Sequence, residues 1–345
     1  MASFEIRKIA EVLLERKGLQ RLRLDDGFNA YNLTDLTGPV SNGDVVVVNT
    51  TAVELGLGTG GFHIVHWNLS RSGLTTKTHP GQVMKARYTS IQTNVDAAEP
   101  RLLDGTDRLN GIPVIVCSLH SQMGIAAAAF HNDAPHRRLA YVMTDGAALP
   151  IAISDLVYEL KKSDVLCGTV TVGHAFGGDL ESVSVAGGLL AAAHLLNADA
   201  IVLAMGPGTV GTGTTYGTTA LEVVESLGWV RRLGGHPIFA LRVSEGDDRN
   251  RHQGLSHHSR TALEMLAFDG AIASVEIPVP AGFVISDTIV EQARTATIDV
   301  GDIANLLEGT GIQITTMGRD MRADPVFFRF AAAAGRVGAR RLVGP

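Results

Sequence analysis

The sequence is poor in cysteine and in aromatic residues, and it carries no excess of positive charge. Only two cysteines, Cys117 and Cys167, occur in 345 residues, which excludes a disulfide framework and a four-cysteine zinc site and predicts a reducing, cytoplasmic setting. A formal net charge of −6 argues against a protein that binds nucleic acid or an anionic membrane surface. Aromatic residues make up 5% of the chain against 39 glycines, a balance that suits an α/β protein with many tight turns.

Long uninterrupted hydrophobic runs are also missing. The most apolar long window, residues 183–205, is interrupted by His194, Asn197 and Asp199, so we expect a helix, a turn and a buried strand there rather than a membrane span. The first twelve residues mix acidic and basic side chains and lack the apolar stretch of a signal peptide. We therefore expect a cytoplasmic protein that does not enter the membrane.

The pattern of residues 1–96 predicts a series of short strands separated by turns. Turn signals stand at Gly18, at Asp26-Gly27 and at Asn42-Gly43. This pattern predicts a small β-barrel of the oligonucleotide-binding type. Residues 1–100 contain as many Lys and Arg as Asp and Glu, so electrostatic attraction to nucleic acid is not expected. The glycine-rich residues 56–61 are expected either to approach a ligand or the other domain, or to form a wide turn at the barrel mouth.

After a charged linker at residues 97–111, the pattern changes to apolar runs that alternate with helical spacing. This alternation predicts a doubly wound, mostly parallel α/β (Rossmann-like) domain over residues 112–345, with a C-terminal helical extension. Within 285–345 we expect a helix, a short strand and a helix. The predicted strands are residues 113–119, 139–143, 168–172, 200–205, 237–243 and 271–279.

A glycine- and threonine-rich loop at residues 206–217 lies between a buried strand and a helix. This arrangement directs backbone N–H groups and the helix dipole at an anion, so the loop is predicted to bind a phosphate or carboxylate. The G-x-G-x-x-G spacing is present, but Arg231 and Arg232 stand where an NAD site needs an acid, and no lysine completes a Walker A loop. Alternatively, the glycines only permit a tight turn. The predicted ligand-binding residues are Gly206, Gly208, Thr209, Gly211, Thr212, Gly213 and Thr214.

Polar residues follow each of the first five predicted strands, at the edge where parallel sheets hold their ligands. A divalent metal bound by His174, Asp179, His257 and His258 is one option. In a metal-free alternative, His120 or His257 acts as general base, oriented by Asp145 or Asp179. In a third reading, Ser256 merely caps a helix that carries exposed histidines. The candidate catalytic residues are His120, Asp145, His174, Asp179, His257 and His258.

Seven stretches spread over nearly the whole chain form a recognisable pattern. They are LTGPV at 36–40, VNTTAVELGLGTGGFH at 48–63, MKARYT at 84–89, YVMTDGAALP at 141–150, TVGHAFGGDLE at 171–181, AMGPGTVGTGT at 204–214 and LSHHS at 255–259. With these stretches the chain resembles a bacterial family, the domain of unknown function number 3866. The resemblance implies the two-domain organisation without implying a reaction, a ligand or catalytic residues.

Together these patterns predict an enzyme whose site lies at the carboxyl edge of the sheet. Hydrolysis or group transfer on a small anionic molecule fits better than hydride transfer, because the ribose-binding acid is missing. The cofactor is left open, with a divalent metal as one option. The alternative is a non-catalytic ligand sensor or a component of a homo-oligomeric assembly.

Overall fold

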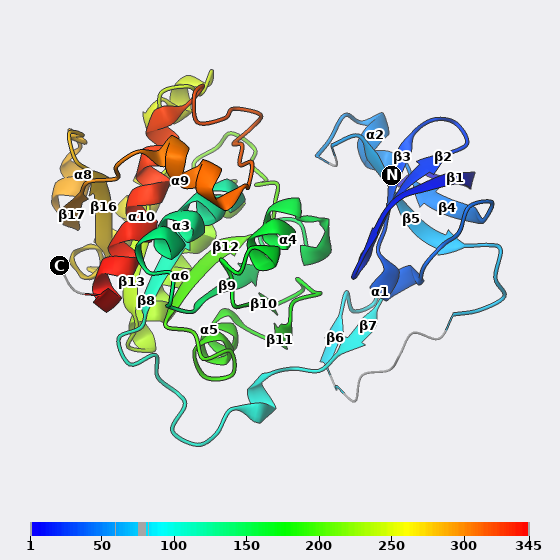
Figure 1. Ribbon diagram of the computed structural model, residues 1–345, viewed down its shortest axis with the longest axis horizontal. Helices are drawn as coiled ribbons and strands as arrows, with labels where there is room; N and C mark the ends of the chain where they lie inside the picture. The colour runs from blue at the N-terminus through cyan, green and yellow to red at the C-terminus, as the bar shows by residue number, and fades with distance from the viewer. Residues whose placement is uncertain (1, 59, 75–80, 82, 344–345) are drawn as a thin grey trace. The chain divides into compact units, whose positions relative to one another are not determined.

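The computed structural model describes residues 2–58, 60–74, 81 and 83–343. The chain divides into two compact units, Met1–Ala97 and Ala98–Pro345, which are drawn in Figure 1 and described separately below. The predicted fold class is confirmed: a small closed β-barrel is followed by a large parallel sheet with helices. Among the described residues, no helix combines the length and the apolar character needed to cross a bilayer.

The first unit is a closed barrel of five strands in the order β1-β2-β3-β5-β4. Neighbouring strands are antiparallel except β3 and β5, which run parallel. Apolar side chains at alternate strand positions, including Leu22, Val46 and Val48, fill the interior. Two short helices, α1 and α2, connect the strands. The bounds are β1 Phe4–Arg16, β2 Leu19–Leu24, β3 Asn29–Asn32, α1 Thr34–Thr37, β4 Val45–Asn49, α2 Thr51–Glu54 and β5 Phe62–Asn68.

A short hairpin follows the barrel, formed by β6 (Val83–Lys85) and β7 (Thr93–Val95). The apolar pattern of the sequence suggests one strand over residues 84–95. Ala86 and Tyr88 have positive φ angles of 47° and 64°, a conformation that interrupts a strand and turns the chain back on itself.

The second unit is built on an eight-stranded sheet in the order β11-β10-β9-β12-β8-β13-β16-β17. Every pair of neighbouring strands in it is parallel. Strands β8, β9, β10 and β12 are buried along their whole length, as strands with helices on both faces must be. The bounds are β8 Pro113–Cys117, β9 Leu139–Thr144, β10 Gly168–Val172, β11 Leu180–Ser182, β12 Ala200–Met205, β13 His236–Ala240, β16 Glu276–Pro280 and β17 Arg294–Ile298.

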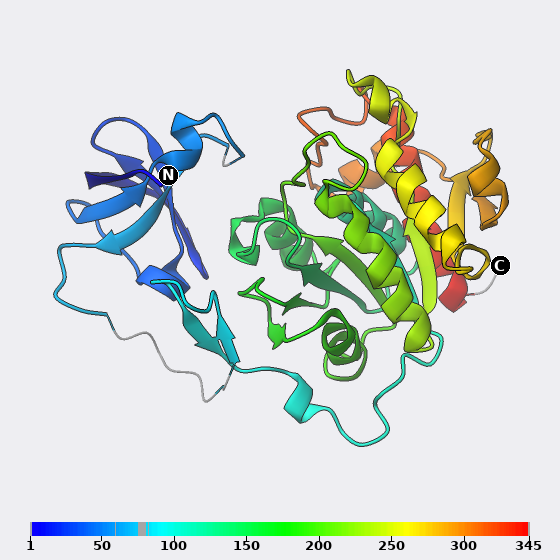
Figure 2. The ribbon, with the colours of Figure 1, turned by 180° about the vertical axis from the view of Figure 1, so that it is seen from behind.

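Helices cover both faces of this sheet, as the sequence predicts. One face packs against α3 (His120–Asp133), α4 (Asp155–Lys162), α9 (Ile303–Thr310) and α10 (Pro325–Val343), and α3 and α10 lie side by side in front of the sheet in Figure 1. The other face, seen from its own side in Figure 2, carries the remaining helices. These are α5 Val185–His194, α6 Glu222–Arg232, α7 His257–Phe268 and α8 Thr288–Glu291.

Two segments of the second unit differ from the sequence-based expectation. The start of the expected linker is tied to the sheet, because Ala98 N donates to Glu181 O over 2.7 Å and Val183 N donates to Glu99 Oε1 over 2.7 Å. The C-terminal part contains three helices rather than two, since α9 stands between β17 and α10. The first difference depends on contacts between segments that are distant in sequence, whereas α9 has local signals at both ends, an N-cap at Asp302 and a left-handed Gly311.

The connections from β8 and from β12 leave the sheet on opposite faces. Strand β8 continues into α3 on one face, and its neighbour β12 continues into α6 on the other. Where two adjacent strands send their connections in opposite directions, a crevice opens beyond their carboxyl ends, and open α/β sheets bind their ligands there. The carboxyl ends of β8 and β12 are therefore the first place to look for a site.

Candidate functional site

His120, the first residue of α3, lies between the carboxyl ends of β8 and β12. Its Nδ1 lies 3.2 Å from the Met205 carbonyl oxygen at the end of β12, and its Nε2 lies 2.7 Å from Ser154 Oγ. Burial lowers the pKa of His120 to about 4, so the ring is neutral near pH 7. Both ring nitrogens therefore have hydrogen-bond partners. The side chain connects the start of α3 with the end of β12 and with the residue that precedes α4. A catalytic role for His120 stays a prediction.

A carboxyl group that sequence reasoning missed lies beside this crevice. Glu222, at the start of α6, accepts a hydrogen bond from the hydroxyl of Thr144, the last residue of β9. Burial, followed by the negative charges of Asp145 and Glu225, raises the pKa of Glu222 to about 7, although the Thr144 hydrogen bond opposes the rise. Glu222 therefore takes up and releases a proton near neutral pH. An acid in the first turn of the helix that follows the glycine loop is the signal that could have identified it.

Asp145 lies next to Glu222 and is exposed. Its Oδ2 accepts a hydrogen bond from the backbone N–H of His174 over 2.9 Å, so the turn after β10 is anchored to the end of β9. A Cβ placed on Gly173 would lie 2.2 Å from the same carboxylate oxygen, which explains the glycine there. The structure thus brings the predicted residues Asp145 and His174 together, through the His174 backbone.

Asp179 lies at the opposite edge of the sheet from the other candidates. It directly precedes β11, level with Thr169 near the amino end of β10. Its carboxylate accepts hydrogen bonds from the Thr169 backbone N–H at 2.9 Å and from Lys161 Nζ at 2.6 Å. Burial raises the pKa of Asp179, but the Lys161 and Thr169 contacts outweigh burial and lower it. Because β11 runs parallel to β10, the connecting loop has to return to the amino end, and it carries Asp179 with it.

The loop at 206–217 is mostly exposed, and its two halves pair with each other as in a hairpin. Thr212 N donates to Gly217 O over 2.7 Å and Thr219 N donates to Val210 O over 2.9 Å, so several of its backbone groups are used internally. The positive end of α6 that follows carries the acidic residues Glu222 and Glu225 in its first turn. The seven predicted ligand-binding residues, Gly206, Gly208, Thr209, Gly211, Thr212, Gly213 and Thr214, share this loop, and their role in binding stays a prediction.

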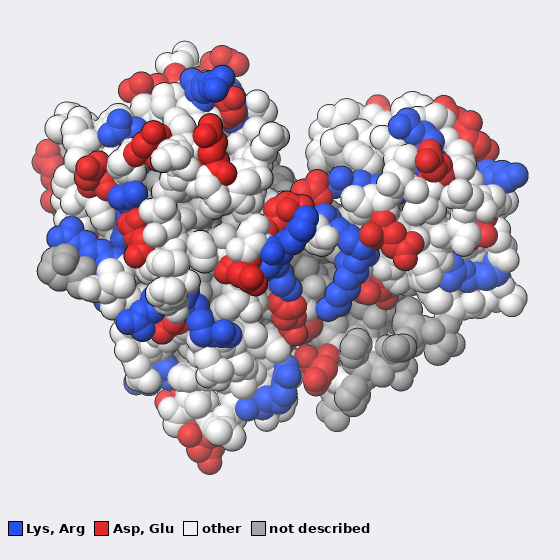
Figure 3. Space-filling model, in the orientation of Figure 1, with Lys and Arg blue, Asp and Glu red and all other residues white. Residues whose placement is uncertain are grey.

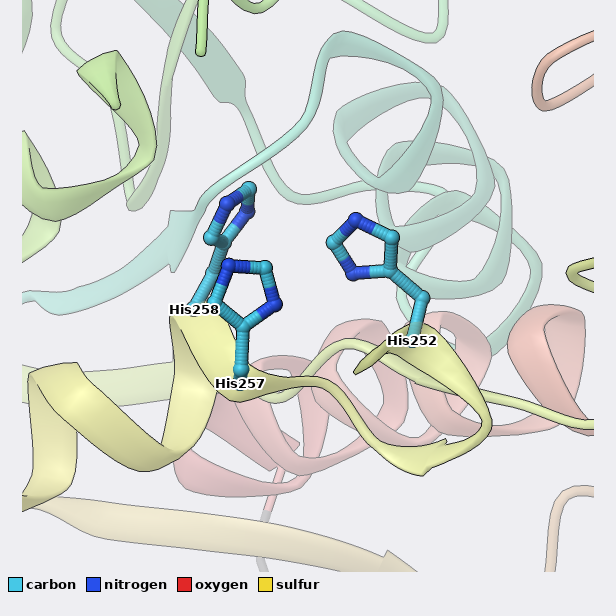
Figure 4. A group of neighbouring side chains, drawn as sticks. All are labelled: His252, His257 and His258. Atoms are coloured by element: carbon cyan, nitrogen blue, oxygen red, sulfur yellow. The ribbon is translucent and has the colours of Figure 1, made fainter. Parts of the chain in front are cut away.

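Three histidines converge further along the same edge, beyond the end of β13 (Figure 4). His252 belongs to the short 3-10 helix η4 (Asn250–His252), and His257 and His258 begin α7. One ligand atom from each ring lies within 4.8 Å of the other two. Burial, followed for His258 by the neighbouring His257 and for His252 by Arg242, lowers the pKa of His252 to about 3 and that of His258 to about 4. Sequence reasoning identified His257 and His258 but missed His252.

The four predicted metal candidates do not share one site. His174 directly follows β10, whereas His257 and His258 follow β13, and strands β9, β12 and β8 stand between those two strands. At roughly 4.8 Å between neighbouring strands, β10 and β13 are about 19 Å apart. Within the described part of the chain, the group that can hold a metal consists of His252, His257 and His258.

A buried cluster of arginines and aspartates lies near the histidines. Asp247 accepts hydrogen bonds from Arg242 at 2.9 Å, Arg249 at 2.8 Å and Arg319 at 3.1 Å. The Arg249 hydrogen bond, and then the nearby guanidinium charges, hold the pKa of Asp247 far below its usual range against the effect of burial. Arg319 also lines a cleft of about 810 Å³ formed by α9 and the segment that leads into α10. Sequence reasoning assigned no role to these arginines.

Comparison with known protein families gives a match over most of the chain. A family described as "Protein of unknown function (DUF3866)" matches residues 29–335. The chain belongs to this family. The match begins in β3 of the barrel and ends inside α10, so family membership covers most of both units. No curated protein and no solved structure matches the chain significantly.

Proposed function

We propose that the protein is a cytoplasmic enzyme, a hydrolase or group transferase, that acts on a phosphate- or carboxylate-bearing small molecule at the carboxyl edge of its parallel sheet. The observation that carries the proposal is the pair of carboxyl groups of Glu222 and Asp145 beside the crevice where the connections of β8 and β12 diverge. The free thiols of Cys117 and Cys167 support a reducing compartment.

The two carboxyl groups suit acid–base chemistry because their environments differ. Glu222 is partly buried, and Thr144 holds one of its oxygens, whereas Asp145 is exposed to solvent. A carboxyl group with a raised pKa beside a second, solvent-exposed carboxyl group is the arrangement that lets a protein donate and accept protons at the same pH. Glu222 would act as the general acid and Asp145 as the base or as the group that orients water.

Binding of an anionic substrate would favour the protonated form of Glu222, which this assignment requires. A phosphate or carboxylate near Glu222 adds negative charge and disfavours the ionised form of the side chain, so the bound complex keeps the proton needed for a leaving group. Threonine hydroxyls of the 206–217 loop, which follows β12 directly, are the nearest donors by sequence for such an anion.

Turnover of a panel of anionic compounds tests this proposal. The purified protein is incubated with p-nitrophenyl phosphate, nucleoside triphosphates, sugar phosphates and carboxylate esters, and product release is measured by mass spectrometry and a phosphate assay. We expect Glu222→Gln and Asp145→Asn to lower the rate by about 10²-fold or more. Glu264→Gln is the matched control, because Glu264 is an exposed acid on α7 and is not among the charges that shift the pKa of Glu222.

The outcome of the panel separates this function from the alternatives. A compound that binds and raises the melting temperature without being turned over would support a ligand sensor instead. Turnover that Glu222→Gln and Asp145→Asn both leave unchanged would contradict the assigned site.

A further inference from the structure

Two buried ring nitrogens in the histidine cluster have no hydrogen-bond partner among the residues that the structure describes. They are His257 Nε2 and His258 Nδ1, and both are shielded from solvent. Buried imidazole nitrogens in folded proteins normally have a partner, because loss of hydration without a replacement contact is unfavourable. Two such atoms on adjacent residues, in rings whose centroids are 4.1 Å apart, require an explanation.

The tautomer of His257 determines whether its unpaired nitrogen, Nε2, carries a hydrogen or a lone pair. His257 Nδ1 lies 3.1 Å from the carbonyl oxygen of Arg251, which accepts hydrogen bonds and cannot donate them. Nδ1 therefore carries the hydrogen, and in the neutral ring Nε2 presents a lone pair. His252 is also held by a hydrogen bond, in this case with a hydroxyl group that can donate or accept: its Nδ1 lies 2.8 Å from Ser256 Oγ. Hydrogen bonds of this type orient the imidazole ligands of metal ions.

The charged groups around the cluster do not supply an alternative partner. Apart from burial and the other histidines of the cluster, the charges that most strongly lower the pKa of His252 and His258 belong to arginines. These are Arg242, Arg249 and Arg251. Arg242 and Arg249 are themselves paired with Asp247. Among the described residues, no carboxylate forms an ion pair with any of the three rings, so a shared proton or an acid–imidazolium pair does not account for their convergence.

We propose that His252, His257 and His258 bind one divalent transition-metal ion of the class that prefers imidazole, such as Zn²⁺. In a tetrahedral zinc site, ligand nitrogens are roughly 3.4 Å apart, so the observed spread of up to 4.8 Å closes with ring movements of about 1 Å. Three imidazole ligands leave a fourth position open, as in zinc sites that hold a water molecule or a substrate. The surrounding guanidinium groups favour an anion, a phosphate or a carboxylate, in that position. This inference stands independently of the proposed acid–base site at Glu222.

Calorimetric titration with zinc tests the site directly. Full-length protein is stripped with a chelator, desalted and titrated with ZnCl₂, with MgCl₂ as a second probe. We expect one Zn²⁺ per chain and no comparable binding of Mg²⁺, which prefers oxygen ligands. His257→Ala and His258→Ala should each weaken zinc binding by at least 10-fold. His136→Ala and His174→Ala are the matched controls, and they should leave the zinc affinity unchanged.

A spectroscopic measurement on the wild-type chain covers the case in which a substituted protein fails to fold. Nitrogen NMR of the histidine rings, with and without Zn²⁺, should show the His257 Nε2 and His258 Nδ1 signals shift on metal addition while the His136 signals stay in place. Absence of binding, unshifted signals of these two nitrogens, or equal affinity in His257→Ala and the wild-type chain would overturn the proposal.

Discussion

The Thr144 hydroxyl at the end of β9 donates a hydrogen bond to the Glu222 carboxylate at the start of α6. Strand β12 lies directly beside β9, and α6 follows β12 along the chain, so this contact connects two segments on the same side of the β8–β12 crevice. A Cβ on Gly146 would lie 2.2 Å from Glu222 Oε2, which shows how closely the backbone approaches the carboxyl group.

The raised pKa of Glu222 predicts a loss of stability with rising pH. Burial raises the pKa of Glu222 from 4.5 in the unfolded chain to about 7 in the folded one, so the folded protein binds the extra proton. The contribution is present below pH 4.5 and is lost as the pH rises through 7, and it amounts to no more than about 3 kcal/mol. Urea denaturation from pH 4.5 to 8 should show a smaller decline for Glu222→Gln than for the wild-type chain. An equal decline in both would contradict the assignment, and Glu264→Gln, at an exposed position on α7, should behave as wild type.

Glu276 predicts a pH dependence of the opposite sign. Its side chain is only 4% exposed and contacts His236 Nε2 at 2.7 Å and Arg341 Nε at 3.0 Å. Burial raises the pKa of Glu276, but the hydrogen bonds from His236 and Arg341 outweigh burial and lower it to about 2. This stabilisation is present above pH 4.5 and is lost as the pH falls towards 2.

The variant Glu276→Gln should therefore be less stable than wild type at pH 7, by about 1–3 kcal/mol, with the difference shrinking towards pH 2. Denaturation curves at pH 7, 4 and 3 measure the difference. Glu264→Gln, at an exposed position on α7, is the control and should show no such trend. A difference that stays constant across the pH range would show that the charge of Glu276 is not its cause.

Removal of the Asp247 carboxylate should be strongly destabilising. Arg242 is 4% exposed, and its Nε has no hydrogen-bond partner, so its remaining ion pair with Asp247 is the main compensation for a buried charge. Asp247→Ala leaves that charge without its partner and should lower the free energy of unfolding by about 3–5 kcal/mol. The neighbouring Asp248 is exposed, and Asp248→Ala should change stability by less than about 0.5 kcal/mol. Similar values for the two variants would show that the cluster adds little to stability.

Two glycine-to-alanine changes should act in opposite directions. A Cβ on Gly335 of α10 would lie 2.1 Å from the Ala126 carbonyl oxygen of α3, so Gly335→Ala forces the two helices apart and should cost about 1–3 kcal/mol. Gly309 lies in α9 with open space around it, and Gly309→Ala should stabilise the protein by about 0.4–1 kcal/mol. Thermal unfolding of both variants measures the contrast. A melting temperature for Gly335→Ala at or above the wild-type value would mean that the helix contact tolerates a methyl group.

The elements of this fold were predictable because their signals are local. Residues 200–205 form an uninterrupted apolar run, and the structure has strand β12 at Ala200–Met205. The position of β12 between β9 and β8 was not predictable, because strand order depends on pairings between distant segments. Edge strand β11 is short and only partly buried, so sequence reasoning did not predict it, whereas β17 is the short strand expected within 285–345.

The candidate site was predictable only where it follows a strand directly. Asp145 and the 206–217 loop are at the carboxyl edge for that reason. Asp179 was assigned to the same edge, but its loop returns to the amino end of the sheet. His252 was missed because it lies in a short 3-10 helix whose position relative to α7 depends on the folded chain. On the face drawn in Figure 3, Lys and Arg are interspersed with Asp and Glu over much of the second unit, a pattern that net charge alone does not reveal.

The pairing of α10 with α3 has a consequence for synthesis of the chain. Residues 122–130 of α3 are all buried in the finished protein, and part of that burial comes from α10, which begins at Pro325. At roughly 5–20 residues per second, a ribosome needs about 10–40 s to travel from one helix to the other. During that interval the apolar surface of α3 that packs against α10 in the folded protein is exposed. We therefore expect chaperones to bind the nascent chain.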